Sequence, residues 1–147
     1  MRKLLAEGLG TFAASGLMRV LFPGDPSLGA TRPAGTAWQS FVLEIVLTWF
    51  LMTVVLGVST GSKEKGLLAG VASGAVVALE ALFAGPISGA SMNPARSIGP
   101  AVVSGNLGSL WLYVLAPVTG ACLAVVSCRC VQVEGVSYEG MNSLTGG

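Results

Sequence analysis

Four long apolar runs divide the chain, and each has about the length that crosses a lipid bilayer. They cover residues 4–22, 37–58, 67–84 and 110–131. A helix needs about 20 predominantly apolar residues to span the hydrocarbon core. Because backbone polar groups inside lipid must be satisfied within the protein, runs of this length fold as helices. We therefore predict an all-α membrane protein with about four transmembrane helices and a polar tail over residues 132–147.

The composition agrees with a membrane protein and argues against several classes of function. Of the 147 residues, 52% are hydrophobic and 10% are charged, whereas soluble domains carry about 25% charged residues. The formal net charge of +1 offers no electrostatic attraction for nucleic acid. The chain has no histidine and no recognisable phosphate-binding loop or nucleophile–base pair. We therefore predict no enzyme activity, no cofactor and no metal site.

Three cysteines lie in or just after the last apolar run, at Cys122, Cys128 and Cys130. The spacing of Cys128 and Cys130 is compatible with a metal or redox pair, but no second pair or histidine completes such a site. We interpret the three residues as apolar filler with one thiol at the membrane interface. S-palmitoylation at this helix end is an alternative.

A break between the third and fourth runs is the most informative stretch of the chain. Residues 85–100 read GPISGASMNPARSIGP, which interrupts the apolar pattern with small residues. Asn93 is a good helix N-cap, and Pro94 suits the first helical position because its missing N–H would be unpaired there. The helix that starts here is too short to span a bilayer. We predict a re-entrant half helix over residues 93–104.

The start of this half helix brings unusual chemistry into the membrane. An ordinary helix start explains Asn-Pro-Ala equally well when the tripeptide is taken alone. Inside a bilayer, however, the positive end of the helix dipole repels cations and attracts oxygen lone pairs. The Asn93 amide offers two donors, and Arg96 adds a permanent cation with five donors. This arrangement indicates a pore or a binding site for neutral molecules.

Residues 83–100 resemble the second signature loop of the aquaporin, or major intrinsic protein, family. Residues 28–31 and 40–44 are also similar to that family, especially to its Nodulin-26-like branch. The similarity covers nearly the whole chain. It implies that residues 1–131 form a partial aquaporin-like transmembrane domain that lies in a lipid bilayer. It further implies a channel for water, glycerol or other small neutral solutes, metalloid acids included.

The resemblance also implies roles for individual residues. Asn93 matches the donor at the pore centre, and Arg96 matches the cation of the narrow selectivity filter. Gly89, Ala90 and Ser91 match the positions whose backbone carbonyls line the path.

Three further positions concern the width and the support of the pore. Ala81 and Ala90 match filter positions, and both are small, which favours a wide filter. Glu44 matches a buried carboxylate that braces the loop by accepting its backbone N–H groups. Glu80 matches no role in the family, so it remains an unassigned acid inside a membrane span.

One departure from the family pattern leaves three interpretations open. Family members have two inverted repeats with one Asn-Pro-Ala half helix each, and this chain has one complete repeat. A single copy therefore cannot enclose the family's pore. The chain is then a channel subunit completed by a partner, as a homo-oligomer or with full-length aquaporin-like subunits. Alternatively, it is a truncated, non-conducting subunit that modulates full-length channels, or a piece of a longer gene product.

The basic residues predict the orientation in the membrane. With four spans, Arg2, Lys3, Lys63, Lys65 and Arg129 fall on one side. Basic residues accumulate on the cytoplasmic side, so both termini are expected there, in the plasma membrane or another cell membrane. Small residues at helix-neighbour spacing also predict close packing on the third and fourth runs. They are Gly70, Gly74 and Ala78, and Ala116, Gly120 and Ala124.

Overall fold

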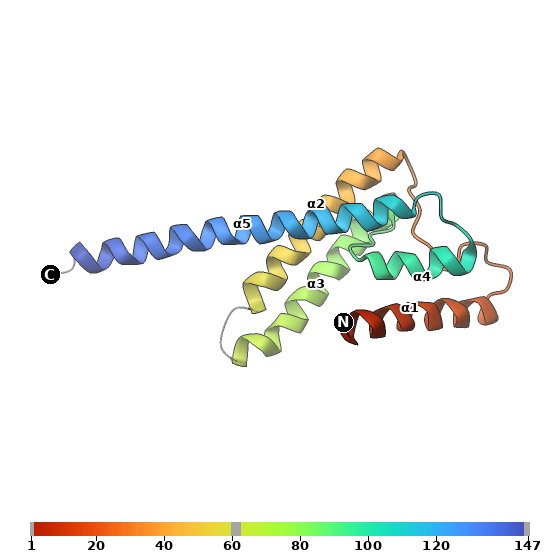
Figure 1. Cartoon of the computed structure of the whole chain (residues 1–147), viewed down its shortest axis with the longest axis horizontal. Helices are drawn as coiled ribbons and strands as arrows, with labels where there is room; N and C mark the ends of the chain where they lie inside the picture. Colours follow the sequence, from red (N-terminus) through yellow and green to blue (C-terminus); the bar gives the residue numbers. More distant parts are fainter. Residues whose placement is uncertain (1, 60–62, 146–147) are drawn as a thin grey trace.

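The computed structural model describes residues 2–59 and 63–145, and the side chains of residues 6–58 and 68–131. The described residues form helices α1 (Arg2–Leu21), α2 (Ala37–Ser59), α3 (Lys63–Ser88), α4 (Pro94–Ser104) and α5 (Leu110–Thr145), shown in Figure 1. No strand occurs among them. The prediction of an all-α membrane fold is confirmed.

Three of the described helices have the length and hydropathy of membrane spans, over Ala37–Val58, Leu68–Ser88 and Leu110–Val131. Their mean hydropathies are 2.3, 1.8 and 1.9. Many of their large apolar side chains lie on the surface, which suits contact with lipid. Helix α1 has 20 residues but is not among the described helices that meet these criteria. The membrane span over residues 4–22, the first of the four predicted, therefore stays a prediction.

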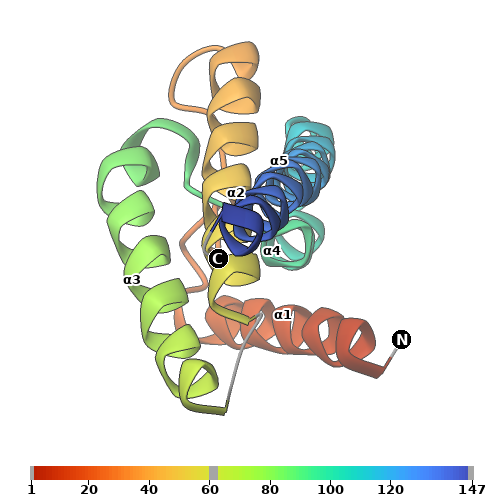
Figure 2. The ribbon, with the colours of Figure 1, turned by 90° about the vertical axis from the view of Figure 1, so that its left-hand side faces the viewer.

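Helix α2 lies at the centre of the bundle. It packs against α3 on one side and α5 on the other, while α4 packs against α5 and α1. Figure 2 shows α2 beside α3, with α1 running across the direction of α2. Helix α1 touches α4 closely, because a Cβ on Gly99 would lie 2.8 Å from the Cβ of Thr11. Small residues thus set the distance between helices, as expected in lipid.

The two faces of small residues differ in their surroundings. On α5, Ala116, Gly120 and Ala124 are buried, and Gly120 faces the backbone of α2 at Ile45 and Trp49. On α3, Gly70, Gly74 and Ala78 are exposed. Only the α5 face therefore has a partner within the described residues.

The helix boundaries differ from the prediction at three places. Helix α3 continues through Pro86 to Ser88, so the break is confined to residues 89–93. Helix α3 begins at Lys63, before the predicted start of the third run at residue 67, and residues 60–62 lie outside the described residues. Helix α5 continues to Thr145, so most of the polar tail is helical, and residues 146 and 147 lie outside the described residues.

The connection between α1 and α2 packs against the last turn of α3 and against Gly89, which follows it. The Ala34 N–H donates to the Ile87 carbonyl at 2.9 Å. At the start of the connection, the Ser27 hydroxyl and N–H donate to Asp25 at 2.7 and 2.8 Å. These bonds hold the pKa of the Asp25 carboxyl below its usual range, and the bond from the Ser27 hydroxyl has the largest effect.

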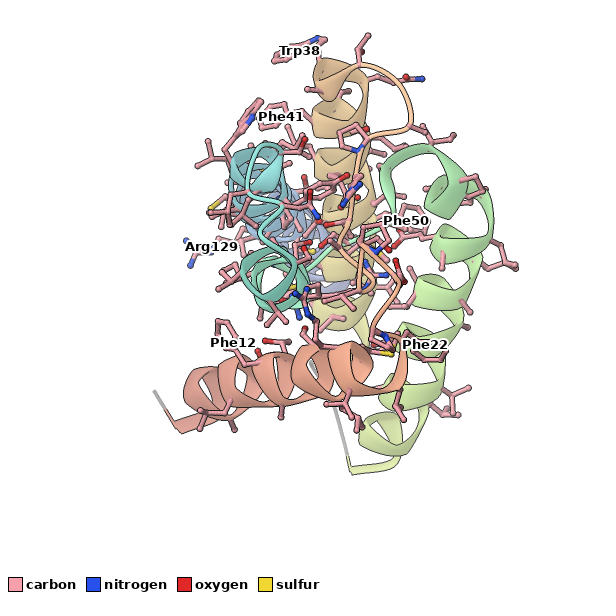
Figure 3. The ribbon with its side chains drawn as sticks, turned by 90° about the vertical axis from the view of Figure 1, so that its right-hand side faces the viewer. Phe12, Phe22, Trp38, Phe41, Phe50 and Arg129 are labelled. Atoms are coloured by element: carbon pink, nitrogen blue, oxygen red, sulfur yellow. The ribbon has the colours of Figure 1, made fainter. Side chains whose placement is uncertain are left out.

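Aromatic rings gather where α2 and α5 begin. The rings of Trp38 and Phe41 stack with centroids 5.5 Å apart, and those of Phe41 and Trp111 stack at 5.6 Å. Figure 3 shows Trp38 and Phe41 at this end of α2. Trp residues are enriched where a membrane meets water. The stack indicates the boundary of the bilayer at this end of the bundle.

Candidate pore-lining site

Asn93 occupies the N-cap of α4. Its backbone is extended, with φ −148° and ψ 118°, and its Oδ1 accepts the N–H of Ala95 at 2.9 Å. Pro94 follows at the first helical position, where it leaves no N–H unpaired. The side-chain amide nitrogen of Asn93 has no hydrogen bond among the described residues, and the residue is exposed. The donors of its amide are therefore unpaired within the described part of the chain.

Three of the five residues before α4 have an unusual backbone. Gly89, Ala90 and Met92 have φ values of 86°, 42° and 53°. This left-handed region is disfavoured for residues that carry a Cβ. The conformation turns the carbonyls of Gly89 and Ala90 toward Arg96, whose Nη1 donates to them at 3.0 and 3.1 Å. Such strain persists only where the surroundings impose it.

Glu44 supplies much of that constraint from the middle of α2. Its carboxylate is fully buried. Oε1 accepts the N–H of Ser91 at 2.9 Å and the hydroxyl of Ser88 at 2.7 Å. Oε2 accepts the N–H of Met92 at 2.9 Å. One carboxylate therefore satisfies two backbone donors that the strained turn would otherwise leave unpaired.

Ser88 and Tyr113 extend this network, and sequence reasoning missed both. The Ser88 hydroxyl, besides donating to Glu44, accepts the N–H of Ala90 at 3.2 Å. The Tyr113 hydroxyl donates to the Ser88 carbonyl. Tyr113 and Ser88 are buried. The sequence offered one signal for Tyr113: a phenol hydroxyl inside an apolar run needs a hydrogen-bond partner in lipid.

A second set of hydroxyls joins the loop to α4 and to the α1–α2 connection. The hydroxyls of Ser91 and Ser97 lie 2.6 Å apart, and those of Ser97 and Thr31 lie 2.7 Å apart. The Ser91 hydroxyl also lies 2.9 Å from the Asn93 carbonyl, to which it donates. Sequence reasoning missed Ser97 and assigned no contact to Thr31. These bonds fix the position of the Asn93 backbone.

Most of the residues singled out in the sequence line one cavity of about 540 Å³. Its walls come from α2, α3, α4, α5 and the loop before α4. Its lining includes Ala81, Ala90, Ser91, Asn93 and Arg96. Gly89 is not in the lining and instead lies against the side chain of Thr31. Glu44 lies outside the lining too, behind the loop that it holds.

A second cavity of about 420 Å³ lies on the α1 side of the same residues. Asn93 and Arg96 line this cavity as well, together with Glu7, Thr11 and residues of the α1–α2 connection. The side chains of Asn93 and Arg96 are exposed. They therefore lie at the boundary between the two cavities and are not enclosed by the described part of the chain.

Comparisons with known proteins agree with this geometry. The family model described as "Major intrinsic protein" matches residues 4–127. The chain belongs to the major intrinsic protein family. Its relatives include Aquaporin NIP1-1 of Zea mays, which is 51% identical over 119 residues, covering 80% of this chain and 42% of the relative. Nodulin-26 of Glycine max is 47% identical over 119 residues, covering 80% and 44%.

These relatives place the chain in the Nodulin-26-like branch of the aquaporins, as predicted. Members of the family are integral membrane channels and not enzymes. The chain spans less than half the length of either relative, 42% of Aquaporin NIP1-1 and 44% of Nodulin-26.

Proposed function

We propose that this aquaporin-like chain supplies one half of a membrane channel for small neutral solutes such as water, glycerol or metalloid acids. The observation that carries the proposal is the shared cavity, in which Asn93, Arg96, Ala81, Ala90 and Ser91 meet. The lining also includes Thr48, and the rest of it is apolar. A solute that carries hydroxyl groups can exchange hydrogen bonds with the polar groups while its carbon atoms face the apolar side.

The electrostatics favour neutral solutes. Arg96 brings a guanidinium cation, and the N-terminus of α4 adds a positive dipole end beside Asn93. Both repel cations, while the Asn93 amide and the remaining guanidinium donors bind oxygen lone pairs. Ala81 and Ala90 place no large side chain in the cavity. Their size supports passage of solutes larger than water.

Conduction requires a second half on the open side of the site. Asn93 and Arg96 are exposed, and polar groups left facing lipid are costly. A second copy or a full-length aquaporin-like subunit would cover them. The basic residues support an orientation with both termini in the cytoplasm of the plasma membrane or another cell membrane. The aromatic stack of Trp38, Phe41 and Trp111 lies at the opposite end of the spans from Arg129.

Swelling of proteoliposomes tests the proposal. Vesicles that hold only this chain should swell in glycerol no faster than empty vesicles. Co-reconstitution with the part of the maize relative that this chain does not cover should raise the rate above both single-component controls. Asn93→Leu should remove the gain because it removes the donors, whereas the lipid-facing change Val42→Ala should keep it. Rapid swelling by this chain alone would refute the need for a partner.

The alternative function is a non-conducting subunit that alters full-length channels. The exposed small-residue face of Gly70, Gly74 and Ala78 favours it, because such faces pack against other helices in lipid. Gly74→Cys, in a chain whose native cysteines are serine, should cross-link to Nodulin-26 in shared vesicles and change their swelling rate. Leu82→Cys, which is 77% exposed on the same helix, is the matched control. Equal cross-linking by the two variants, with unchanged swelling, would exclude this function.

A further inference from the structure

The hydroxyl of Thr48, in the middle of α2, is buried without a partner. The residue is 3% exposed, and its Oγ1 has no hydrogen bond among the described residues. Thr53, Thr119 and Ser127 each donate to the carbonyl four residues earlier in the same helix, at 2.8, 2.9 and 2.8 Å. Thr48 makes no such bond. A buried hydroxyl in this condition costs free energy until a partner reaches it.

The depth of Thr48 restricts the route by which a partner can reach it. Leu47 and Thr48 are the two central residues of the Ala37–Val58 span. Lipid headgroups do not reach this depth, and the surrounding hydrocarbon offers no donor or acceptor. Thr48 does, however, line the cavity of about 540 Å³ that contains Asn93 and Arg96. A partner for the hydroxyl therefore comes through this cavity.

The other polar side chains of the cavity lining are those of Ser91, Asn93 and Arg96. The Ser91 hydroxyl already donates to the Asn93 carbonyl at 2.9 Å, and Arg96 Nη1 donates to two loop carbonyls at 3.0 and 3.1 Å. The amide nitrogen of Asn93 is unpaired within the described part of the chain. A solute in the cavity therefore meets an unpaired donor at the start of α4 and an unpaired hydroxyl on α2.

The contact between α2 and α5 holds Thr48 in place. A Cβ on Gly120 would lie 2.9 Å from the Thr48 Cβ, so the backbone of α5 passes close beside this side chain. Thr48 follows Glu44 by four residues, which places both on one face of α2 with about 6 Å between them along the axis. A hydroxyl that is fixed in this way can bind a solute at a low cost in entropy. The part of the lining that comes from α5 is apolar and consists of Pro117, Val118 and Ala121.

We propose that Thr48 is a specificity-determining residue of the channel, whose hydroxyl binds one hydroxyl of a polyol while Asn93 binds another. This role rests on the proposed function, because it names polyols as the preferred class among the neutral solutes. A polyol carries hydroxyls on separate carbon atoms and can pair with both groups at once. A water molecule or a monohydric alcohol has a single oxygen to share between them.

Binding of glycerol to this chain alone tests the role of Thr48. Saturation-transfer NMR in deuterated dodecylphosphocholine micelles measures the dissociation constant of such a weakly bound solute. Thr48→Val keeps the shape of the side chain and removes its hydroxyl, so glycerol should bind about 3- to 10-fold more weakly, as expected for one hydrogen bond. Propan-1-ol is the matched probe with one hydroxyl, and its dissociation constant should change by less than about 2-fold. Thr48→Ser keeps the hydroxyl and should bind glycerol like the unmodified chain.

Two further variants separate the hydroxyl from the packing. Thr48→Ala also lacks the hydroxyl and should weaken glycerol binding as valine does, which keeps the test decisive if the valine variant fails to fold. Ser40→Ala removes a second buried hydroxyl of α2 that has no partner among the described residues but lies outside the cavity lining, so glycerol binding should be unchanged. No glycerol binding by the unmodified chain, or undiminished binding by Thr48→Val and Thr48→Ala, would overturn the proposal. A loss of the same size in Thr48→Ser or Ser40→Ala would overturn it as well.

Swelling of the co-reconstituted vesicles described above separates this role from conduction itself. Thr48→Val should lower the glycerol rate about 3- to 10-fold, because glycerol then crosses the middle of the span with one hydroxyl unpaired. The rate of shrinkage driven by water efflux should change by less than about 2-fold. An unchanged ratio of the two rates in conducting vesicles would overturn the role of Thr48. If the unmodified chain with its partner half produces no gain in swelling, the proposed function fails, and the glycerol dissociation constants still decide whether Thr48 binds the solute.

Discussion

Replacing Glu44 with leucine is expected to destabilise the chain by at least about 3 kcal/mol, because three buried donors lose their acceptor at once. The donors are the N–H groups of Ser91 and Met92 and the hydroxyl of Ser88. Besides Gly89, two loop residues that carry a Cβ, Ala90 and Met92, are held in the left-handed region. Without the carboxylate, the loop can relax toward ordinary backbone angles and carry Asn93 away from the cavity. Thermal unfolding in detergent micelles, followed by circular dichroism, measures the loss of stability.

A graded series separates the lost hydrogen bonds from the change in volume. Glu44→Gln keeps the shape and one acceptor oxygen, but it places an amide N–H₂ against donors, so its loss should be intermediate. Val42→Ala, on the exposed face of the same helix, should change stability by no more than about 0.5 kcal/mol. If the leucine variant were as stable as Val42→Ala, the carboxylate would not hold the loop.

Local sequence patterns were enough to predict where α2 and α4 lie. The second apolar run, residues 37–58, became Ala37–Ser59, and the half helix over residues 93–104 became Pro94–Ser104. Both results follow from signals that act within a few residues, namely hydrophobic length and the Asn-Pro cap. The predicted third run ends at residue 84, whereas α3 continues through Pro86 to Ser88. Proline is tolerated in membrane helices where neighbouring groups satisfy the freed backbone.

The hydrogen-bond network behind the loop could not be predicted from such local signals. Tyr113 lies 25 residues from Ser88, and Thr31 lies 66 residues from Ser97. Serine and threonine occur throughout the chain, and which of them meet depends on how the helices pack. The sequence likewise could not reveal that Glu80 faces an apolar groove while Glu44 faces the loop. The two acids occur in similar apolar surroundings along the chain, and only the rotation of each helix distinguishes them.

Gly120→Ala is expected to push α5 away from α2 and to destabilise the chain by about 2 kcal/mol or more, as overpacking does. A Cβ at this position would overlap the Ile45 carbonyl oxygen and lie 2.9 Å from the Thr48 Cβ and 3.0 Å from the Trp49 nitrogen. Two of these three atoms belong to the backbone of α2 and cannot rotate aside. The better helix propensity of alanine, about 1 kcal/mol, offsets only part of the strain.

Gly74→Ala is the matched control, because a Cβ at Gly74 meets nothing within 4 Å. This variant should be neutral or more stable by up to about 1 kcal/mol. Trp49 supplies a second measurement, since its indole N–H donates to the Ser127 hydroxyl of α5 at 3.1 Å. With Trp38 and Trp111 changed to phenylalanine, Gly120→Ala should shift the Trp49 fluorescence and Gly74→Ala should leave it unchanged. If the two variants unfolded at the same temperature with the same spectrum, close backbone contact at Gly120 would not set the distance between α2 and α5.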